Sequence, residues 1–214
     1  VTFREPRKPS PSVAVEEDTG PVGAQRKFEA LPENHVAVAD QLTNPHPLVA
    51  RSVHLLRKTK ADEQLRLRTY GLECVALKVT LGSVDRALRI YDALFKALTV
   101  RGHRVELLEK ENNALQTVVH IGEDAVPIEI MEPVTRTELP KQKSAYAWES
   151  KQYSYEATGR LSLVMVESYL DVRGKWSDGA RQRLDEMLND VIVGLVAAAE
   201  AMKARRARWA QAEL

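Results

Sequence analysis

The spacing of apolar residues changes abruptly in the middle of the chain, and this change limits the possible folds more than any other feature. Apolar residues alternate with small or polar ones over 75–81, which is the period of a half-buried strand. Over 84–98 they recur every three or four residues, which predicts an amphipathic helix with Ser83 as its N-terminal cap. Gly102 is suited to end that helix in a left-handed conformation, and a strand over 104–109 follows. The segment therefore predicts strand, helix and strand with short joints.

The C-terminal half predicts an antiparallel sheet and one more helix. Four segments have the character of strands: 115–121, 126–131, 153–156 and 161–169. We expect the first two to form a hairpin, and the last two to form another that turns at Thr158 and Gly159. Pro127 removes one ladder donor, which indicates an edge strand or a bulge. A long helix with apolar positions from 184 to 199 follows, capped by Ser177 or Asp178.

This order of elements indicates an α+β fold. An antiparallel sheet with one apolar face must be covered, and the two amphipathic helices are available to cover it. We therefore predict a two-layer sandwich, in which a mostly antiparallel sheet of about five strands is covered by two amphipathic helices.

The chain divides into three parts by composition. Half of its ten prolines fall in the first 35 residues, so we interpret 1–43 as a proline-rich linker or extended arm without regular structure. Residues 44–72 are expected to form a helix that begins near Pro47, followed by a polar connector. The α+β domain then spans 73–214 and ends in the long helix.

Composition excludes a broadly basic nucleic-acid binder, a protein with internal disulfides and a membrane-spanning protein. Of the 214 residues, 44% are hydrophobic and 29% are charged, which is ordinary for a globular chain. Lys plus Arg is 31 and Asp plus Glu is 30, so nucleic-acid binding would need a local patch. The single cysteine, Cys74, excludes an internal disulfide and suits the reducing cytoplasm, where we expect the protein. The longest apolar run, Val191–Ala199, falls short of the about 20 residues that a membrane span needs.

Two segments are candidates for contact with a partner or a nucleic acid. The first places aromatic and basic residues close together: Lys141, Lys143, Tyr146, Trp148 and Lys151. Such a mixture suits single-stranded nucleic acid, a protein interface, or a loop packed on the sheet, and these alternatives remain open. The second is the basic end of the last helix: Lys203, Arg205, Arg206 and Arg208. It suits the helix dipole, the DNA backbone or an acidic partner.

Catalytic chemistry has one weak candidate. Asp124, Glu129 and Met131 fall where a metal-dependent nuclease of the PD-(D/E)xK kind has acid, acid and lysine. Methionine cannot polarise a water molecule or a phosphate, so an exposed hairpin edge is the competing interpretation. The five histidines are dispersed and form no metal-ligand pair at helical spacing. We predict no catalytic residue, no metal and no cofactor.

Four stretches together carry a resemblance to known proteins: 44–49 (NPHPLV), 83–90 (SVDRALRI), 155–161 (YEATGRL) and 176–179 (WSDG) with 182–184 (QRL). In this order they resemble the C-terminal domain of a group of poorly characterised bacterial proteins. In that group a small helix-turn-helix domain and a proline-rich link come first. The resemblance covers about residues 44–200 and implies a DNA-associated regulator without catalytic residues. Because the chain begins with valine, we expect the helix-turn-helix to precede Val1.

The function expected from the sequence is therefore the C-terminal dimerisation or effector-sensing module of a bacterial DNA-binding transcriptional regulator. We expect a homodimer that binds DNA through a domain absent from this chain, since two-fold proteins read two half-sites. A metal-dependent nuclease or hydrolase, and a stand-alone domain with weak nucleic-acid binding, are the alternatives.

Overall fold

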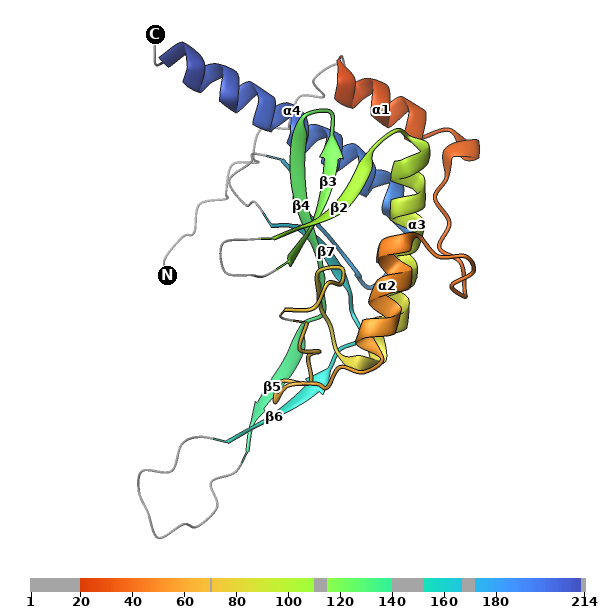
Figure 1. Cartoon of the computed structure of the whole chain (residues 1–214), viewed down its shortest axis with the longest axis vertical. Helices are drawn as coiled ribbons and strands as arrows, with labels where there is room; N and C mark the ends of the chain where they lie inside the picture. The colour runs from red at the N-terminus through yellow and green to blue at the C-terminus, as the bar shows by residue number, and fades with distance from the viewer. Residues whose placement is uncertain (1–19, 70, 110–114, 140–151, 167–171, 213–214) are drawn as a thin grey trace, which may run out of the picture.

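The computed structural model of the chain describes residues 20–69, 71–109, 115–139, 152–166 and 172–212. Its main sheet has six strands: β1 (Leu77–Lys78), β2 (Arg104–Glu109), β3 (Leu115–Ile121), β4 (Asp124–Met131), β7 (Ser162–Met165) and β8 (Lys175–Ser177). The strand order is β2-β3-β4-β7-β8 (Figure 1), and β1 pairs with the C-terminal end of β4. All pairs are antiparallel except β1 with β4. The predicted α+β class is confirmed.

Two helices supply most of the apolar cover of this sheet. They are α3 (Val84–Val100) and α4 (Leu188–Ala212). Their apolar side chains form one buried cluster with strand residues such as Val119 and Ile128. Tyr91 of α3 is fully buried, and its hydroxyl donates to the carbonyl of Ala76 at 2.8 Å. Since alternate residues of a strand face opposite sides, both helices cover the face that carries Val119.

Several local predictions are confirmed. Residues Pro47–Leu56 form α2, and Nδ1 of His46 accepts from the amide of Leu48 at its N-terminus. Gly102 has a φ of 81° just after α3. The hairpin of β3 and β4 has the register Ile121↔Asp124. Local signals were sufficient for these features because each depends on residues close together in the sequence.

Four local predictions are wrong. Ser83 is at the N-cap position of α3, but its side chain makes no capping bond. Pro127 lies in the central strand β4, where its carbonyl accepts from the amide of Val166 at 2.9 Å. The strand expected over 75–81 is only Leu77–Lys78. The carboxylate of Asp178 accepts a hydrogen bond from the amide of Leu184. Leu184 begins a short 3-10 turn (Leu184–Glu186) that precedes α4, so Asp178 does not cap α4 itself.

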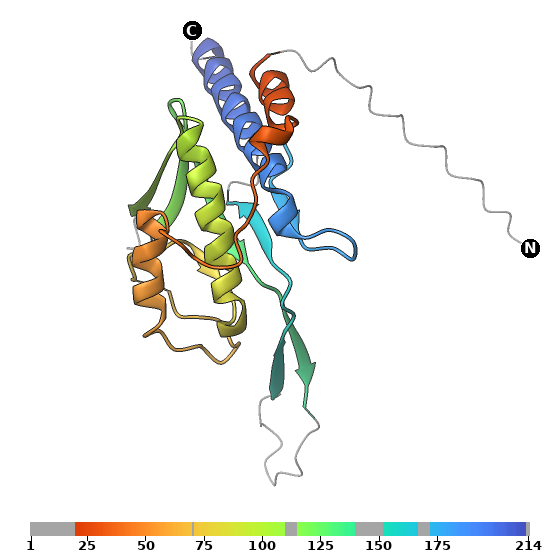
Figure 2. The same cartoon turned by 90° about the vertical axis from the view of Figure 1, so that its right-hand side faces the viewer.

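The predicted second hairpin is also wrong. Strand β6 (Tyr153–Ala157) pairs with β5 (Val134–Glu138), whereas β7 pairs with β4 and β8. Strands β5 and β6 form a separate two-stranded ribbon that projects from the body (Figures 1 and 2). The chain bends at Gly159, whose φ is 66°, where it passes from the ribbon into the main sheet. Thr158 and Gly159 indicate a turn, but they do not reveal whether the strands before and after it pair with each other.

The expectation that 1–43 lacks regular structure is wrong for its later part. Residues Pro21–Glu29 form α1, which lies alongside α4 (Figure 2). The buried carboxylate of Glu29 accepts from Nε of Arg101 at 2.5 Å and from Nδ2 of Asn189 at 2.5 Å. Both donors are distant in sequence, so no local pattern indicated that this segment is ordered. Residues 1–19 lie outside the described part of the chain.

No helix within the described ranges is long and apolar enough to cross a membrane.

Candidate functional site

The projecting ribbon has two different faces. Directly opposed residues share a face, and the register pairs Arg136 with Tyr155 and Glu138 with Tyr153. One face therefore carries both tyrosines, and the guanidinium carbon of Arg136 lies 4.4 Å from the ring centre of Tyr153. The other face carries only polar side chains, among them Thr135 and its partner across the strands. The aromatic face is the side suited to a partner.

The ribbon is also an isolated pair of strands. Within the described part of the chain, no third strand pairs with β5 or β6. A two-stranded ribbon alone is marginally stable in water, and each outer edge presents unpaired backbone groups. Pairing with a further strand would therefore stabilise the ribbon, and its outer edges present the backbone groups for that pairing.

A buried carboxylate fixes the root of the ribbon. Glu132, only 1% exposed, stands just before β5 and accepts from the amide of Gly159, just after β6, at 2.7 Å. It also accepts from the hydroxyl of Thr80 at 2.7 Å and from the amide of Thr80 at 2.8 Å. Burial raises the pKa of Glu132, but the hydrogen bonds from Thr80, Gly159 and Ser83 outweigh it, so the net shift is downward. The ionised carboxylate thus joins both ends of the ribbon to the segment between β1 and α3.

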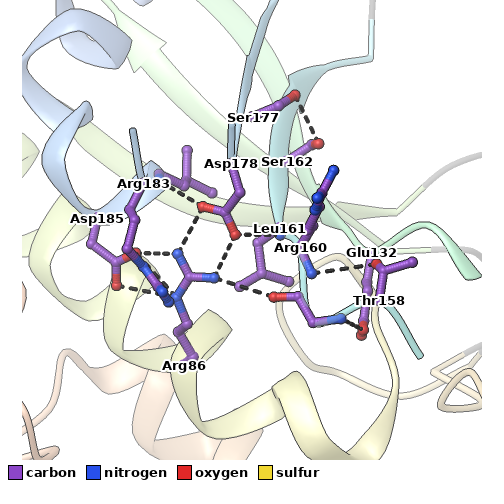
Figure 3. A network of polar contacts seen from close by, with 12 residues as sticks. Arg86, Glu132, Thr158, Arg160, Leu161, Ser162, Ser177, Asp178, Arg183 and Asp185 are labelled. Carbon is purple, nitrogen blue, oxygen red and sulfur yellow. Dashed lines mark hydrogen bonds and ion pairs between the residues drawn. The ribbon is translucent and has the colours of Figure 1, made fainter. Parts of the chain in front are cut away.

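Together with Glu132, an arginine between two aspartates forms a clamp at the root of the ribbon (Figure 3). Arg86 of α3 donates from Nη1 and Nη2 to the two oxygens of Asp178, at 2.6 and 2.8 Å. It also forms an ion pair with Asp185, and its Nη1 lies 3.5 Å from the carbonyl of Gly159. Bidentate pairing of this kind is strong and directional. The guanidinium therefore holds the root of the ribbon, α3 and the entry to α4 in one arrangement.

Asp178 is the centre of this network. Besides Arg86, it accepts from the amides of Leu161 at 2.7 Å and Leu184 at 2.8 Å. Burial raises its pKa, but the bonds from Arg86 and these two amides bring the pKa down to about 2. Bonds to Asp178 and Asp185 likewise raise the pKa of Arg86. Since both oxygens of Asp178 accept hydrogen bonds, the network stabilises the local structure.

Residues from three of the four stretches singled out in the sequence meet in this network. Arg86 comes from 83–90, Gly159 and Leu161 from 155–161, and Asp178 from 176–179. Sequence reasoning did not identify Arg86 or Asp178 as partners because 92 positions separate them.

The structure describes only some of the residues that were predicted to contact a partner or a nucleic acid. The five of the aromatic segment, Lys141, Lys143, Tyr146, Trp148 and Lys151, lie outside the described residues, between β5 and β6 in the sequence. The four basic residues of the last helix all lie on α4: Lys203, Arg205, Arg206 and Arg208.

These four cations of α4 are not equivalent. Arg206 forms an ion pair with the buried Asp124. The guanidinium carbon of Arg205 stacks 4.5 Å from the ring centre of Trp209. The helix continues to Ala212, and its last turn holds no basic residue. The dipole interpretation of this cluster is therefore wrong, because dipole effects are confined to the last turn.

The geometry expected for a metal-dependent nuclease is not found among the described residues. Asp124 is buried rather than exposed and is paired with Arg206, while Glu129 accepts from Nζ of Lys78 at 2.9 Å. Within the described ranges, no three His, Cys, Asp or Glu side chains form a group that could hold a metal ion. Cys74 is buried, and burial raises the pKa of its thiol to about 11, so a reactive thiolate is not formed at neutral pH.

Comparisons with protein-family models, with curated protein sequences and with solved structures found no match to this chain.

Proposed function

We propose that this chain is the self-association module of a bacterial DNA-binding transcriptional regulator that acts in the cytoplasm as a homodimer. The observation that carries the proposal is the projecting β5–β6 ribbon. Its edges pair with no further strand in the described part of the chain, one face carries Tyr153 and Tyr155, and its root is fixed by the buried carboxylate of Glu132 and the half-buried ion pair of Arg86 with Asp178.

A second copy of the chain is the occupant that these features favour. Two ribbons related by a two-fold axis can pair edge to edge, so that each supplies the strands that the other lacks. The contact is then isologous, and both aromatic faces lie on one side of the enlarged sheet. Tyrosine is enriched at the cores of such interfaces because it buries a large surface with little loss of conformational freedom.

The clamp at the root suits the same function. A regulator that reads two half-sites needs its two DNA-binding domains at a defined spacing. Glu132 and Arg86 tie both ends of the ribbon to the domain body, which restricts a hinge at that point. A ribbon that dimerises and is fixed at its root holds the DNA-binding domains joined to the two copies at a defined spacing.

The link to DNA rests on the resemblance of four sequence stretches to proteins that carry a helix-turn-helix domain. The net charge of +1 gives no broad field for DNA, which agrees with DNA contact through a separate domain.

Sedimentation at micromolar concentrations tests the self-association. We expect a dimer for the unaltered chain and a monomer for Tyr155→Glu. The control is Thr135→Lys on the polar face. Each new charge opposes a complementary one across the strands, Arg136 in the first case and Glu156 in the second, so both ribbons should remain paired.

Circular dichroism should be the same for all three proteins. A strict monomer of the unaltered chain at the highest concentration would overturn the proposal. A Tyr155→Glu variant that dimerises as well as the control would show that the contact lies elsewhere.

A further inference from the structure

The N-terminal segment 20–35, which contains α1, adds little to the apolar core. No side chain from this segment belongs to the buried apolar cluster of the described residues. Within α1 only Gly23 and Glu29 are buried, while Phe28 and Leu31, just after the helix, are each 44% exposed. A cavity of about 330 Å³ also lies between α1 and α4. Apolar burial therefore gives this segment little stability.

Polar contacts hold the segment instead, and they converge on two residues of the body. Arg101, just after α3, donates to the two oxygens of Glu29 at 2.5 and 2.6 Å, and to the carbonyl of Asn34 at 2.9 Å. Nδ2 of Asn189 in α4 donates to the Glu29 carboxylate at 2.5 Å and to the carbonyl of Asn34 at 2.8 Å. The side chain of Glu29 is 3% exposed, so these charge-assisted bonds are strong. One carboxylate and its two donors therefore form a latch at the C-terminal end of α1.

The helix has little reason to remain folded once it leaves the body. It has nine residues, and isolated helices shorter than about 12–15 residues are marginal in water. Its N-cap is Gly20, which supplies no side-chain cap, and its first turn holds no acidic residue. Release of the latch would therefore expose the backbone amides of α1 to solvent.

We propose that residues 20–35 form a releasable strap, which opens from the body as one unit while α3 and the main sheet stay folded. The opening uncovers the face of α4 against which α1 lies, where Val193 and Ala197 line the cavity. Segments that switch between ordered and open states have few buried apolar contacts, and such transitions are a common means of regulation. The strap and the ribbon lie at opposite ends of the molecule, so the inference does not depend on self-association (Figures 1 and 2).

Native-state hydrogen exchange of the full chain, measured by mass spectrometry of its peptides, tests the strap. In the unaltered chain the amides of α1 should exchange at least about tenfold faster than those of α3, because the strap opens without global unfolding. Glu29→Gln removes the charge of the latch and should accelerate exchange in α1 by about tenfold. The control Glu33→Gln removes an exposed carboxylate of the same segment and should leave exchange in α1 unchanged.

A core substitution separates local from global opening. Val119 is fully buried beneath the helices, so Val119→Ala should accelerate exchange in α3 by at least about tenfold. Opening of the strap does not expose Val119, so exchange in α1 should not change. Low concentrations of urea should likewise accelerate α3 far more than α1, because the response to denaturant follows the surface that opening exposes.

Three outcomes would overturn the proposal. The first is an equal exchange rate for α1 and α3 in the unaltered chain, and the second is an equal acceleration of both by Val119→Ala. Either result would make α1 part of the cooperative unit that includes the core. The third is exchange in α1 of Glu29→Gln that matches Glu33→Gln, which would show that the carboxylate does not hold the strap.

Discussion

At the scale of single residues, buried or half-buried carboxylates join segments that are far apart in the sequence. Glu29 holds α1 to the end of α3, Glu132 holds the two ends of the ribbon, and Asp178 holds α3 beside β7. Each accepts several bonds, which is the condition under which a buried charge is tolerated.

Asp178 provides a pH test at this scale. Its pKa is about 2 in the fold against an ordinary 3.8, so the stabilisation is complete above pH 3.8 and is lost as pH falls through 2. Asp178→Asn should lower the free energy of unfolding at pH 7 by about 1.5–3 kcal/mol, because the half-buried guanidinium of Arg86 loses a charged partner. The variant should also lose less of its remaining stability between pH 5 and 2 than the unaltered chain, as measured by urea unfolding. Asp190→Asn, an exposed carboxylate, is the control; an equal effect there would contradict the prediction.

Residue-level prediction from the sequence succeeded only where the partners are neighbours. The start of α2 was predicted near Pro47 and is found there, where Nδ1 of His46 accepts from the amide of Leu48, two positions away. The pairing of Glu29 with Arg101 was not predicted, because a separation of 72 positions leaves no local trace.

At the scale of elements, the contact of α4 with β8 depends on one small residue. Glycine in a helix is less favourable than alanine by about 1 kcal/mol, so propensity alone favours Gly194→Ala. Space opposes it, because the added Cβ would stand 2.3 Å from Trp176. We expect Gly194→Ala to destabilise the protein by about 1–3 kcal/mol through overpacking, as measured by thermal unfolding. The control is Gly82→Ala, where a Cβ would meet nothing within 4 Å; a more stable Gly194→Ala variant would refute the argument.

Among the elements, those with their own periodicity were predicted and those defined by their partners were not. Helix α3 and the β3–β4 hairpin follow from apolar spacing and a polar turn. The ribbon was missed because β5 finds its partner 15 positions after its own end, beyond a segment without a clear pattern. Helix α1 was missed because its stability comes from packing on α4 rather than from its own sequence.

At the scale of the whole molecule, charge limits what the chain can do with DNA by itself. The balance of +1 gives no general attraction, so binding depends on local cations. Arg206 forms an ion pair with Asp124, and the other basic residues of the cluster on α4 are Lys203, Arg205 and Arg208. Those three, with up to three lysines of the 141–151 segment, give a salt slope of about −3 to −5.

We therefore expect weak, non-specific binding to duplex or single-stranded DNA that nearly vanishes at physiological salt, as measured by mobility shift at two salt concentrations. Replacing Lys203, Arg205 and Arg208 with alanine should abolish the low-salt binding if α4 carries it. The control replaces Arg57, Lys58 and Lys60, an equal charge on the exposed surface after α2, and should retain it. Sub-micromolar, sequence-selective binding at physiological salt would contradict the prediction, because so few cations cannot supply it without base contacts. The surface that reads DNA would then belong to this chain rather than to a domain joined to it.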